Sequence, residues 1–203
     1  MAETPFDTLT DPIEQRILTG LAKIGLALRS QSWQDAGQLG LTPTQGQILT
    51  LLIEDGESRL SDVAKQLGVT AATASDAVTS LVEKGLVQKN RSSQDGRAIA
   101  ITLTSQGRQA AIQAASWSDF LLETVDELSE EEKVIFLRGL IKMIRKLQQQ
   151  GQISVARMCV TCQFFQPNQY PGSEHPHHCA LVNAPFSDGH LRIHCADHVA
   201  KFT

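Results

Sequence analysis

Residues 60–70 read LSDVAKQLGVT, and this stretch decides the fold because it predicts two helices joined by a sharp turn. Ser61 is a typical helix cap, and the apolar residues after it share one helical face until Gly68, which tolerates the positive φ of a tight turn. Thr70 is expected to cap a second helix that runs to Lys84. Two such helices form either a helix-turn-helix or an ordinary helical hairpin within a core.

The second predicted helix is apolar on one side and polar on the other. The residues spaced to pack inward are Ala74, Ala77, Val78 and Leu81. The outward residues, which are candidate DNA contacts if the pair is a helix-turn-helix, are Thr70, Ala71, Thr73, Ser75 and Thr79.

A β-hairpin with a basic tip is expected after this helix. Residues 86–89 and 98–103 alternate like strands, and the polar segment 90–97 lies between them. Between Lys84 and Arg108 there are five basic residues and one acid, although the whole chain has a net charge of −4. A local positive surface on an acidic protein is typical of phosphate contacts, so the hairpin predicts a wing and favours the helix-turn-helix. The candidate DNA contacts in the wing are Lys89, Arg91, Asp95 and Arg97.

Four short motifs occur here in a specific order and spacing. They are LxxVAxxLGV at 60–69, LxxKGLV at 81–87, RxxxDxR at 91–97 and LTxxG at 103–107. Together they resemble the MarR family of bacterial transcriptional regulators, over roughly residues 11–150. The resemblance implies that Asp95 braces the wing and that Arg97 reaches the minor groove.

One residue departs from this resemblance. Regulators of this kind commonly carry an arginine or lysine where this chain has Asp76. A carboxylate facing DNA repels phosphate, so Asp76 either points away or selects for a cytosine amino group. The departure concerns the target sequence more than DNA binding itself.

Long helices are expected on both sides of the predicted wing domain. Asp11-Pro12 predicts the start of a first helix that ends around residues 29–33, and Thr42-Pro43 opens a support helix. Thr104 starts another long helix, and Ser129 followed by three glutamates starts the last one. The apolar residues of the last helix are spread more broadly than one core face needs. In MarR-like proteins the first and last two helices interlock into a twofold dimer, and the alternative here is a monomer that buries everything internally.

The predicted architecture is therefore mainly α with a small β wing, followed by a small C-terminal module stapled by metal. The MarR-like domain is expected over 11–150. Within it we place the winged helix-turn-helix at about 42–107 and the dimerisation helices at about 11–33 and 104–150. Residues 151–203 form a separate Cys/His-rich tail, to which the family resemblance does not extend.

All four cysteines and all six histidines of the chain lie in that tail. The predicted metal ligands are Cys159, Cys162, Cys179 and Cys195. A module this small needs a staple, and a reducing cytoplasm favours a metal ion over a disulfide. Zinc is the first expectation, with an iron–sulfur cluster and a reversible thiol switch as alternatives. His178 and His194 precede two of the cysteines, so either could replace its neighbour as a ligand or support it by a hydrogen bond.

The sequence thus predicts a homodimeric DNA-binding regulator, a repressor, that binds a pseudo-palindromic operator. A thiol-disulfide enzyme acting through Cys159 and Cys162 is a second hypothesis, but the βαβ context of such enzymes is missing. A third is a tail that docks a protein partner. No catalytic constellation, Gly-rich phosphate loop, signal peptide or membrane span is visible, so we expect a cytoplasmic protein that is not an enzyme and has no membrane partner. The sequence does not identify a small-molecule effector.

Overall fold

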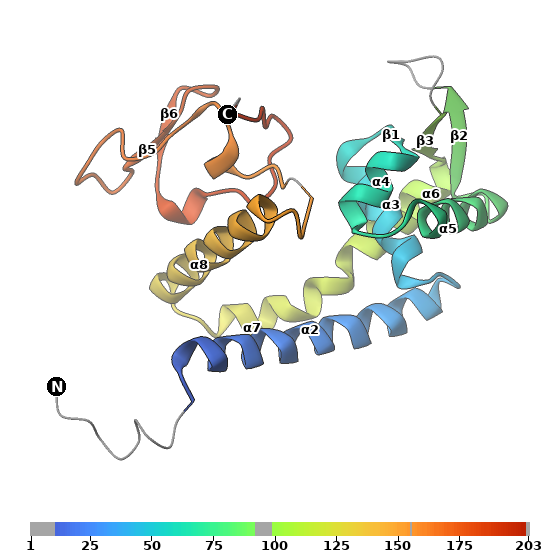
Figure 1. Ribbon diagram of the computed structural model, residues 1–203, viewed down its shortest axis with the longest axis horizontal. Coiled ribbons are helices and arrows are strands. Elements are labelled where there is room, and N and C mark those ends of the chain that lie inside the picture. The colour runs from blue at the N-terminus through green and yellow to red at the C-terminus, as the bar shows by residue number, and fades with distance from the viewer. Residues whose placement is uncertain (1–10, 92–98, 155, 202–203) are drawn as a thin grey trace.

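The computed structural model describes residues 11–91, 99–154 and 156–201. A winged-helix part and the tail lie at opposite ends of the molecule, and long helices run beneath both and connect them (Figure 1). The elements up to the tail are α2 (Ile13–Gln38), α3 (Pro43–Asp55), β1 (Ser58–Arg59), α4 (Leu60–Leu67), α5 (Ala71–Glu83), β2 (Val87–Arg91), β3 (Ile99–Leu103), α6 (Ser105–Ala115), the 3-10 helix η1 (Ser116–Leu121), α7 (Leu122–Asp126) and α8 (Glu130–Gln149). We call α3 to β3 the head.

Helix α3 is the support of the head. Thr42 and Gln45 form a reciprocal capping box at its start, as the Thr42-Pro43 pair predicts. Its apolar residues Ile48, Leu49, Leu51 and Leu52 are buried, and the helix packs against α4, α5 and α6. Lys84, just after α5, donates to the Gln45 side chain at 3.0 Å, which ties the end of α5 to the start of α3.

Helices α4 and α5 form the expected helix-turn-helix. Gly68 has φ of +64° between them, and the Thr70 hydroxyl accepts the Thr73 N–H at 3.1 Å to cap α5. The inward side of α5 is buried at Ala74, Val78 and Leu81. The predicted Ser61 cap is wrong, because α4 already begins at Leu60, directly after strand β1.

The wing sheet has three antiparallel strands in the order β1-β3-β2. Strands β2 and β3 are the predicted hairpin, paired from Val87 opposite Leu103 to Arg91 opposite Ile99. The third strand, β1, was not predicted from the sequence and pairs Ser58 with Ile101. It fixes the start of α4 against the sheet.

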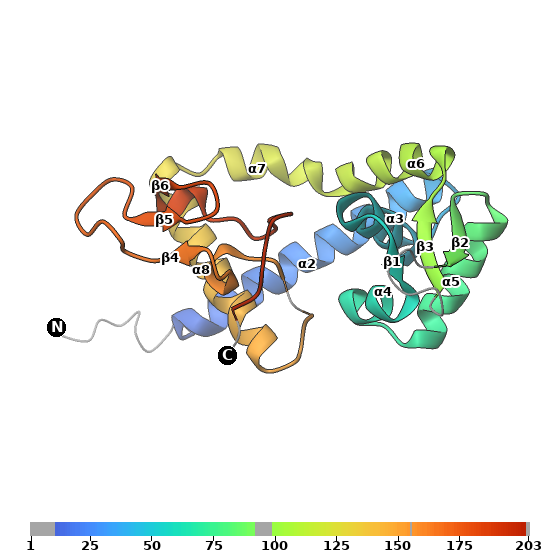
Figure 2. The same cartoon turned by 90° about the horizontal axis from the view of Figure 1, so that it is seen from above.

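The helices outside the head differ from expectation in length. Helix α2 continues to Gln38 instead of ending around residues 29–33. The helix that Thr104 caps is not continuous, because the 3-10 segment η1 separates α6 from α7. In Figure 2, α7 and α6 follow one another along the top of the view, and α2 crosses the view at an angle to them. Helix α2 contacts η1 between α6 and α7.

The tail is a small β module seated on α8. Its sheet has the order β4 (Phe165–Gln166), β5 (His177–Cys179) and β6 (Ala184–Phe186), between the 3-10 helices η2 (Cys159–Thr161) and η3 (Asp188–His190). Ile141 of α8 is buried together with Met158 and Leu191 of the tail. One face of α8 is therefore covered by the tail, and the other face leaves Ile135 and Phe136 exposed.

Across the described ranges, we find no helix with both the length and the apolar character needed to cross a bilayer.

Candidate nucleic-acid interface and cysteine centre

The outward face of α5 is open to solvent. Four of its five predicted contact residues are exposed, namely Thr70, Ala71, Thr73 and Thr79, while Ser75 is half-buried. Asp76 is also exposed on this helix, so its carboxylate is accessible to solvent and not buried. The first turn of α5 contains no acidic residue, which leaves the positive end of the helix dipole uncompensated and favourable for phosphate.

Strand β2 continues this surface into the wing. The Lys89 ammonium donates to the Thr79 hydroxyl at 3.3 Å, so a basic wing residue lies directly beside α5. Lys89 and Arg91 are both exposed. The other two predicted wing contacts, Asp95 and Arg97, lie outside the described residues. Of the basic residues counted in the sequence, Lys84 is engaged at the start of α3 and does not belong to this surface.

The four cysteines come from separate elements and border one cavity. Cys159 begins η2 and Cys162 directly follows it, Cys179 ends β5, and Cys195 lies in the loop after η3. All four line a cavity of about 30 Å³, together with Phe164, Phe165, Leu181, Phe186 and Asp197. All four are free thiols. Within the described ranges, no three Cys, His, Asp or Glu side chains already meet in a geometry that would hold one ion.

Arg192 contacts two of these thiols. Its backbone N–H donates to the sulfur of Cys159 at 3.3 Å, and its guanidinium donates to the sulfur of Cys195 at 3.7 Å. Burial raises the pKa of the Cys159 thiol, and the N–H of Arg192 opposes that rise. Amide and guanidinium donors of this kind stabilise thiolate ligands once a metal has displaced the protons.

The histidines next to the cysteines have other partners. His177 is buried, with its Nδ1 accepting the backbone N–H of Asn168 at 3.2 Å and its Nε2 3.1 Å from a carboxylate oxygen of Asp188. His178 lies 3.4 Å from the hydroxyl of Tyr170. Neither His178 nor His194 lines the cysteine cavity. The geometry therefore places the four cysteines, and not these histidines, around the common space.

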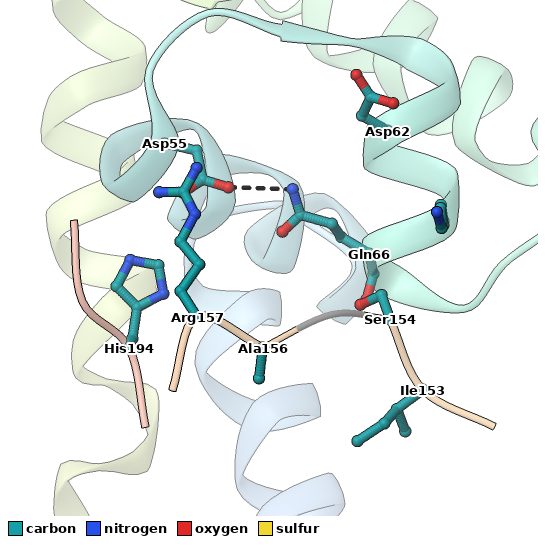
Figure 3. A pocket seen from close by; sticks show the side chains of 9 residues that line it. Asp55, Asp62, Gln66, Ile153, Ser154, Ala156, Arg157 and His194 are labelled. Atoms are coloured by element: carbon teal, nitrogen blue, oxygen red, sulfur yellow. Dashed lines mark hydrogen bonds and ion pairs between the residues drawn. The ribbon is translucent and has the colours of Figure 1, made fainter. Parts of the chain in front are cut away.

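The structure also shows a contact between the tail and the head that the sequence did not reveal (Figure 3). The guanidinium of Arg157 pairs with Asp55, the last residue of α3, at 2.8 Å. The other carboxylate oxygen of Asp55 accepts from the Gln66 amide of α4 at 3.0 Å, and Ser154 donates to the Gln66 carbonyl at 3.2 Å. A groove of about 430 Å³ opens between the two parts, lined also by Asp62, Lys65 and His194. Arg157 and Asp55 are far apart in the sequence and sit in no motif, so local patterns could not pair them.

Arg157 also belongs to the scaffold of the cysteines. Its carbonyl accepts the backbone N–H of Cys195 at 3.0 Å, and Cys159 follows it by two residues. The Asp55 oxygen that faces Arg157 is shielded from solvent. One residue thus connects the cysteine centre to the helix on which the helix-turn-helix rests.

Comparison with known proteins gives consistent matches for the head and helices. Residues 39–98 match the model of the MarR family. Transcriptional regulator AdcR of Streptococcus pneumoniae is 32% identical over 115 residues, covering 53% of this chain and 78% of AdcR. HTH-type transcriptional regulator FarR of Neisseria gonorrhoeae is 27% identical over 129 residues, covering 64% of this chain and 88% of FarR.

Solved structures give the same result. A complex of S. aureus MepR with DNA is 30% identical with a TM-score of 0.53, covering 63% of this chain and 94% of the MepR chain. A MarR family protein from Bacillus stearothermophilus shares the fold at 21% identity, with a TM-score of 0.58 over 67% of this chain and 96% of that chain.

Proposed function

The chain belongs to the MarR family of transcriptional regulators, and from that membership we propose that it binds its operator as a homodimer with α5 in the major groove. Proteins of this family are DNA-binding regulators and not enzymes. The observation that carries the proposal is the exposed polar face of α5 joined to Lys89 of the wing. MepR, which shares the fold at 30% identity, has been solved in complex with DNA.

The homodimer is supported by apolar surface that one protomer leaves uncovered. Exposed apolar side chains lie on α2 at Ile13, Ile17, Leu18, Ile24, Leu26 and Trp33, and on α7 and α8 at Leu122, Val125, Ile135 and Phe136. Ile13, Ile17 and Ile24 share one face of α2, and exposed apolar side chains grouped in this way favour an interface. A twofold dimer presents two copies of α5 about one DNA turn apart, roughly 34 Å, and so reads a pseudo-palindromic operator. Repression follows when such a site overlaps a promoter.

The experiment for this function is a footprint combined with a mass measurement in solution. We expect symmetric protection of two half-sites whose centres lie about one turn apart, and light scattering that gives twice the protomer mass of 22.1 kDa. Asymmetric protection by a protein that stays monomeric at micromolar concentration contradicts the proposal.

For the tail, we propose a metal centre ligated by Cys159, Cys162, Cys179 and Cys195. Support comes from the common cavity that all four border and from the two Arg192 donors. Zinc, the first expectation from the sequence, and an iron–sulfur cluster, its alternative, both accept four thiolates. The tail has few buried apolar residues of its own, so ligation contributes much of its folding free energy.

A sensory role for this centre is favoured over a purely structural one by the contact between Arg157 and Asp55. The state of the centre can bias DNA binding only if it changes contacts with the head, and Arg157 provides such a contact. The test compares operator affinity of the loaded protein, the chelated protein and the double variant Cys159→Ser/Cys162→Ser. A tenfold or larger change supports a sensor. Unchanged affinity with loss of protease resistance in the tail overturns the sensory role.

A further inference from the structure

We propose that Asp76 of α5 selects a cytosine in each half-site of the operator by accepting a hydrogen bond from the cytosine 4-amino group. The proposal rests on the function proposed above, with α5 in the major groove, and adds the residue that determines base preference. It follows from the direction of Asp76, from the chemistry of its neighbours and from the donors that the groove offers.

Asp76 points away from the core of the head. It lies two residues after Ala74 and two residues before Val78, both of which are fully buried. Successive residues of an α-helix are turned by about 100°, so a residue two positions away lies on nearly the opposite side. Asp76 is exposed, and within the described part of the chain no hydrogen bond or ion pair engages its carboxylate. The carboxylate is therefore available to a ligand that lies against the outer face of α5.

The residues around Asp76 leave it as the one side chain of this face with a fixed base preference. It is the only charged residue between Thr70 and Leu81, where the others are alanine, serine, threonine and one valine. Hydroxyl groups both donate and accept, so serine and threonine do not discriminate strongly between bases. The Thr79 hydroxyl, on the next turn, is in addition engaged by Lys89 at 3.3 Å. A carboxylate only accepts, so Asp76 requires a donor on the DNA.

The position of Asp76 along α5 separates its carboxylate from the end of the helix that attracts phosphate. The first turn of α5 contains no acidic residue, and Asp76 follows Ala71, the first residue of the helix, by about 7.5 Å along the axis. The favourable effect of a helix N-terminus on phosphate is confined to the first turn. Asp76 therefore leaves that effect intact and projects toward the base edges that a helix in the major groove faces.

The major groove offers a carboxylate two kinds of donor, the 4-amino group of cytosine and the 6-amino group of adenine. The adenine amino group lies between two acceptors, N7 of the same base and O4 of the paired thymine. The cytosine amino group has an acceptor on one side only, O6 of the paired guanine. A carboxylate is therefore repelled less at cytosine than at adenine. Guanine and thymine present only acceptors to it, so both are rejected.

The test selects duplexes from a randomised pool with the full-length protein. The parent should select cytosine at one symmetric position of each half-site, and T·A in place of that C·G pair in both half-sites should weaken binding about tenfold or more. Asp76→Ala should lose the preference at this position and keep it elsewhere. Asp76→Asn should change the preference to adenine, because an amide bonds N6 and N7 together. The control Glu83→Gln removes another exposed acid of α5 and should keep the preference for cytosine.

The outcomes separate this inference from the function on which it rests. Parent protein that selects no symmetric site overturns the function and the inference together. A symmetric site at which Asp76→Ala and Asp76→Asn keep every preference of the parent, or lose the preference for a base other than cytosine, overturns the inference and leaves the function standing. A merely structural role of Asp76 would change the thermal unfolding of the variants without changing the preferred base.

A second measurement uses the parent protein alone and does not depend on the folding of any variant. The selected cytosine is replaced in both half-sites by 2-pyrimidinone, which lacks the 4-amino group. Binding should weaken as it does for the T·A duplex, because the donor to Asp76 is gone. Unchanged affinity for this duplex overturns the inference.

Discussion

Gly107 shows at the scale of one residue how the wing is joined to α6. A Cβ at this position would overlap the backbone carbonyl of Leu86, which accepts the N–H of Thr104 at 3.1 Å. Gly107→Ala should therefore destabilise the fold by about 1–3 kcal/mol, the usual cost of overpacking. Urea unfolding measures the effect.

The matched control is Gly37→Ala near the end of α2, where an added Cβ meets nothing within 4 Å. This substitution should leave the fold unchanged or stabilise it by up to about 1 kcal/mol, because alanine favours helix. Equal urea midpoints for the two variants would mean that the Leu86 carbonyl does not approach Gly107 closely.

Arg91 is the described wing residue whose removal tests DNA contact most directly. It is exposed at the end of β2 and is expected to contact phosphate, so Arg91→Ala should weaken binding to specific and unrelated duplexes alike. The slope of log affinity against log salt should fall by about 0.9. Arg145→Ala, at another exposed arginine, on α8, should leave both affinity and slope unchanged. An Arg91 variant that matches the parent across the salt titration would refute the contact.

At the scale of elements, the cap of α5 links stability to recognition. The Thr70 hydroxyl accepts the Thr73 N–H, so Thr70→Ala should cost about 1 kcal/mol. Thr70→Ser should keep both the cap and DNA binding. Thr70→Asp should keep the cap but weaken binding, because it places a carboxylate where phosphate is expected.

Thermal unfolding and operator affinity, measured on the same three variants, separate the two effects. If Thr70→Asp binds DNA as tightly as the parent, the N-terminus of α5 does not face the phosphates.

Elements that depend on local chemistry could be predicted from the sequence. The caps at Thr42, Thr70, Thr104 and Ser129 each accept a backbone N–H three residues on, and each helix begins beside its cap. Spacing also identified the outward side of α5, where four of the five residues predicted to face outward are exposed and Ser75 is half-buried. For the cysteines, the spacing predicts metal ligands, which stays a prediction, and it did not reveal the cavity of about 30 Å³ that all four border.

Elements that depend on distant contacts could not be predicted in this way. The break at η1 coincides with Trp117, whose ring lies where a Cβ on Gly46 of α3 would be. Nothing in the sequence around Trp117 reveals that partner. Strand β1 is two residues long and exists through its pairing with β3. Helix α2 runs past the predicted end through Gly37, and the positive φ comes only at Gly40.

At the scale of the whole molecule, assembly depends on α2. Ile17 is half exposed in the protomer and shares a helical face with Ile13 and Ile24. Ile17→Glu should abolish the dimer without unfolding the protomer, because the side chain is not part of a protomer core. Sedimentation should show the protomer mass, and operator affinity should fall at least tenfold. Gln15→Glu on the same helix adds the same charge and serves as control; if both variants remain dimeric, α2 is not the interface.

The contact between tail and head can be tested by a double-mutant cycle. Arg157→Ala leaves a shielded oxygen of Asp55 without its ion-pair partner, whereas Arg157→Ala/Asp55→Asn removes the charge as well. We expect the free energy of unfolding of the double variant to exceed the value obtained by adding the separate effects of Arg157→Ala and Asp55→Asn, by at least about 0.5 kcal/mol. In the sensory model, both variants bind operator equally whether the cysteine centre is loaded or empty. A persistent difference would show that coupling runs through other residues.

The position of Arg157, between the cysteines and Asp55, has a consequence for how such a regulator responds to its surroundings. Coupling between two binding equilibria is reciprocal. If loss of the centre weakens operator binding by some factor, then operator DNA must tighten retention of the centre by that same factor. Protein bound at its promoter would then bind its cofactor more tightly than protein free in solution. The affinity of each promoter for the protein would help to set the conditions under which the cofactor is lost. Promoters of different affinity would therefore respond at different levels of the stimulus that removes it.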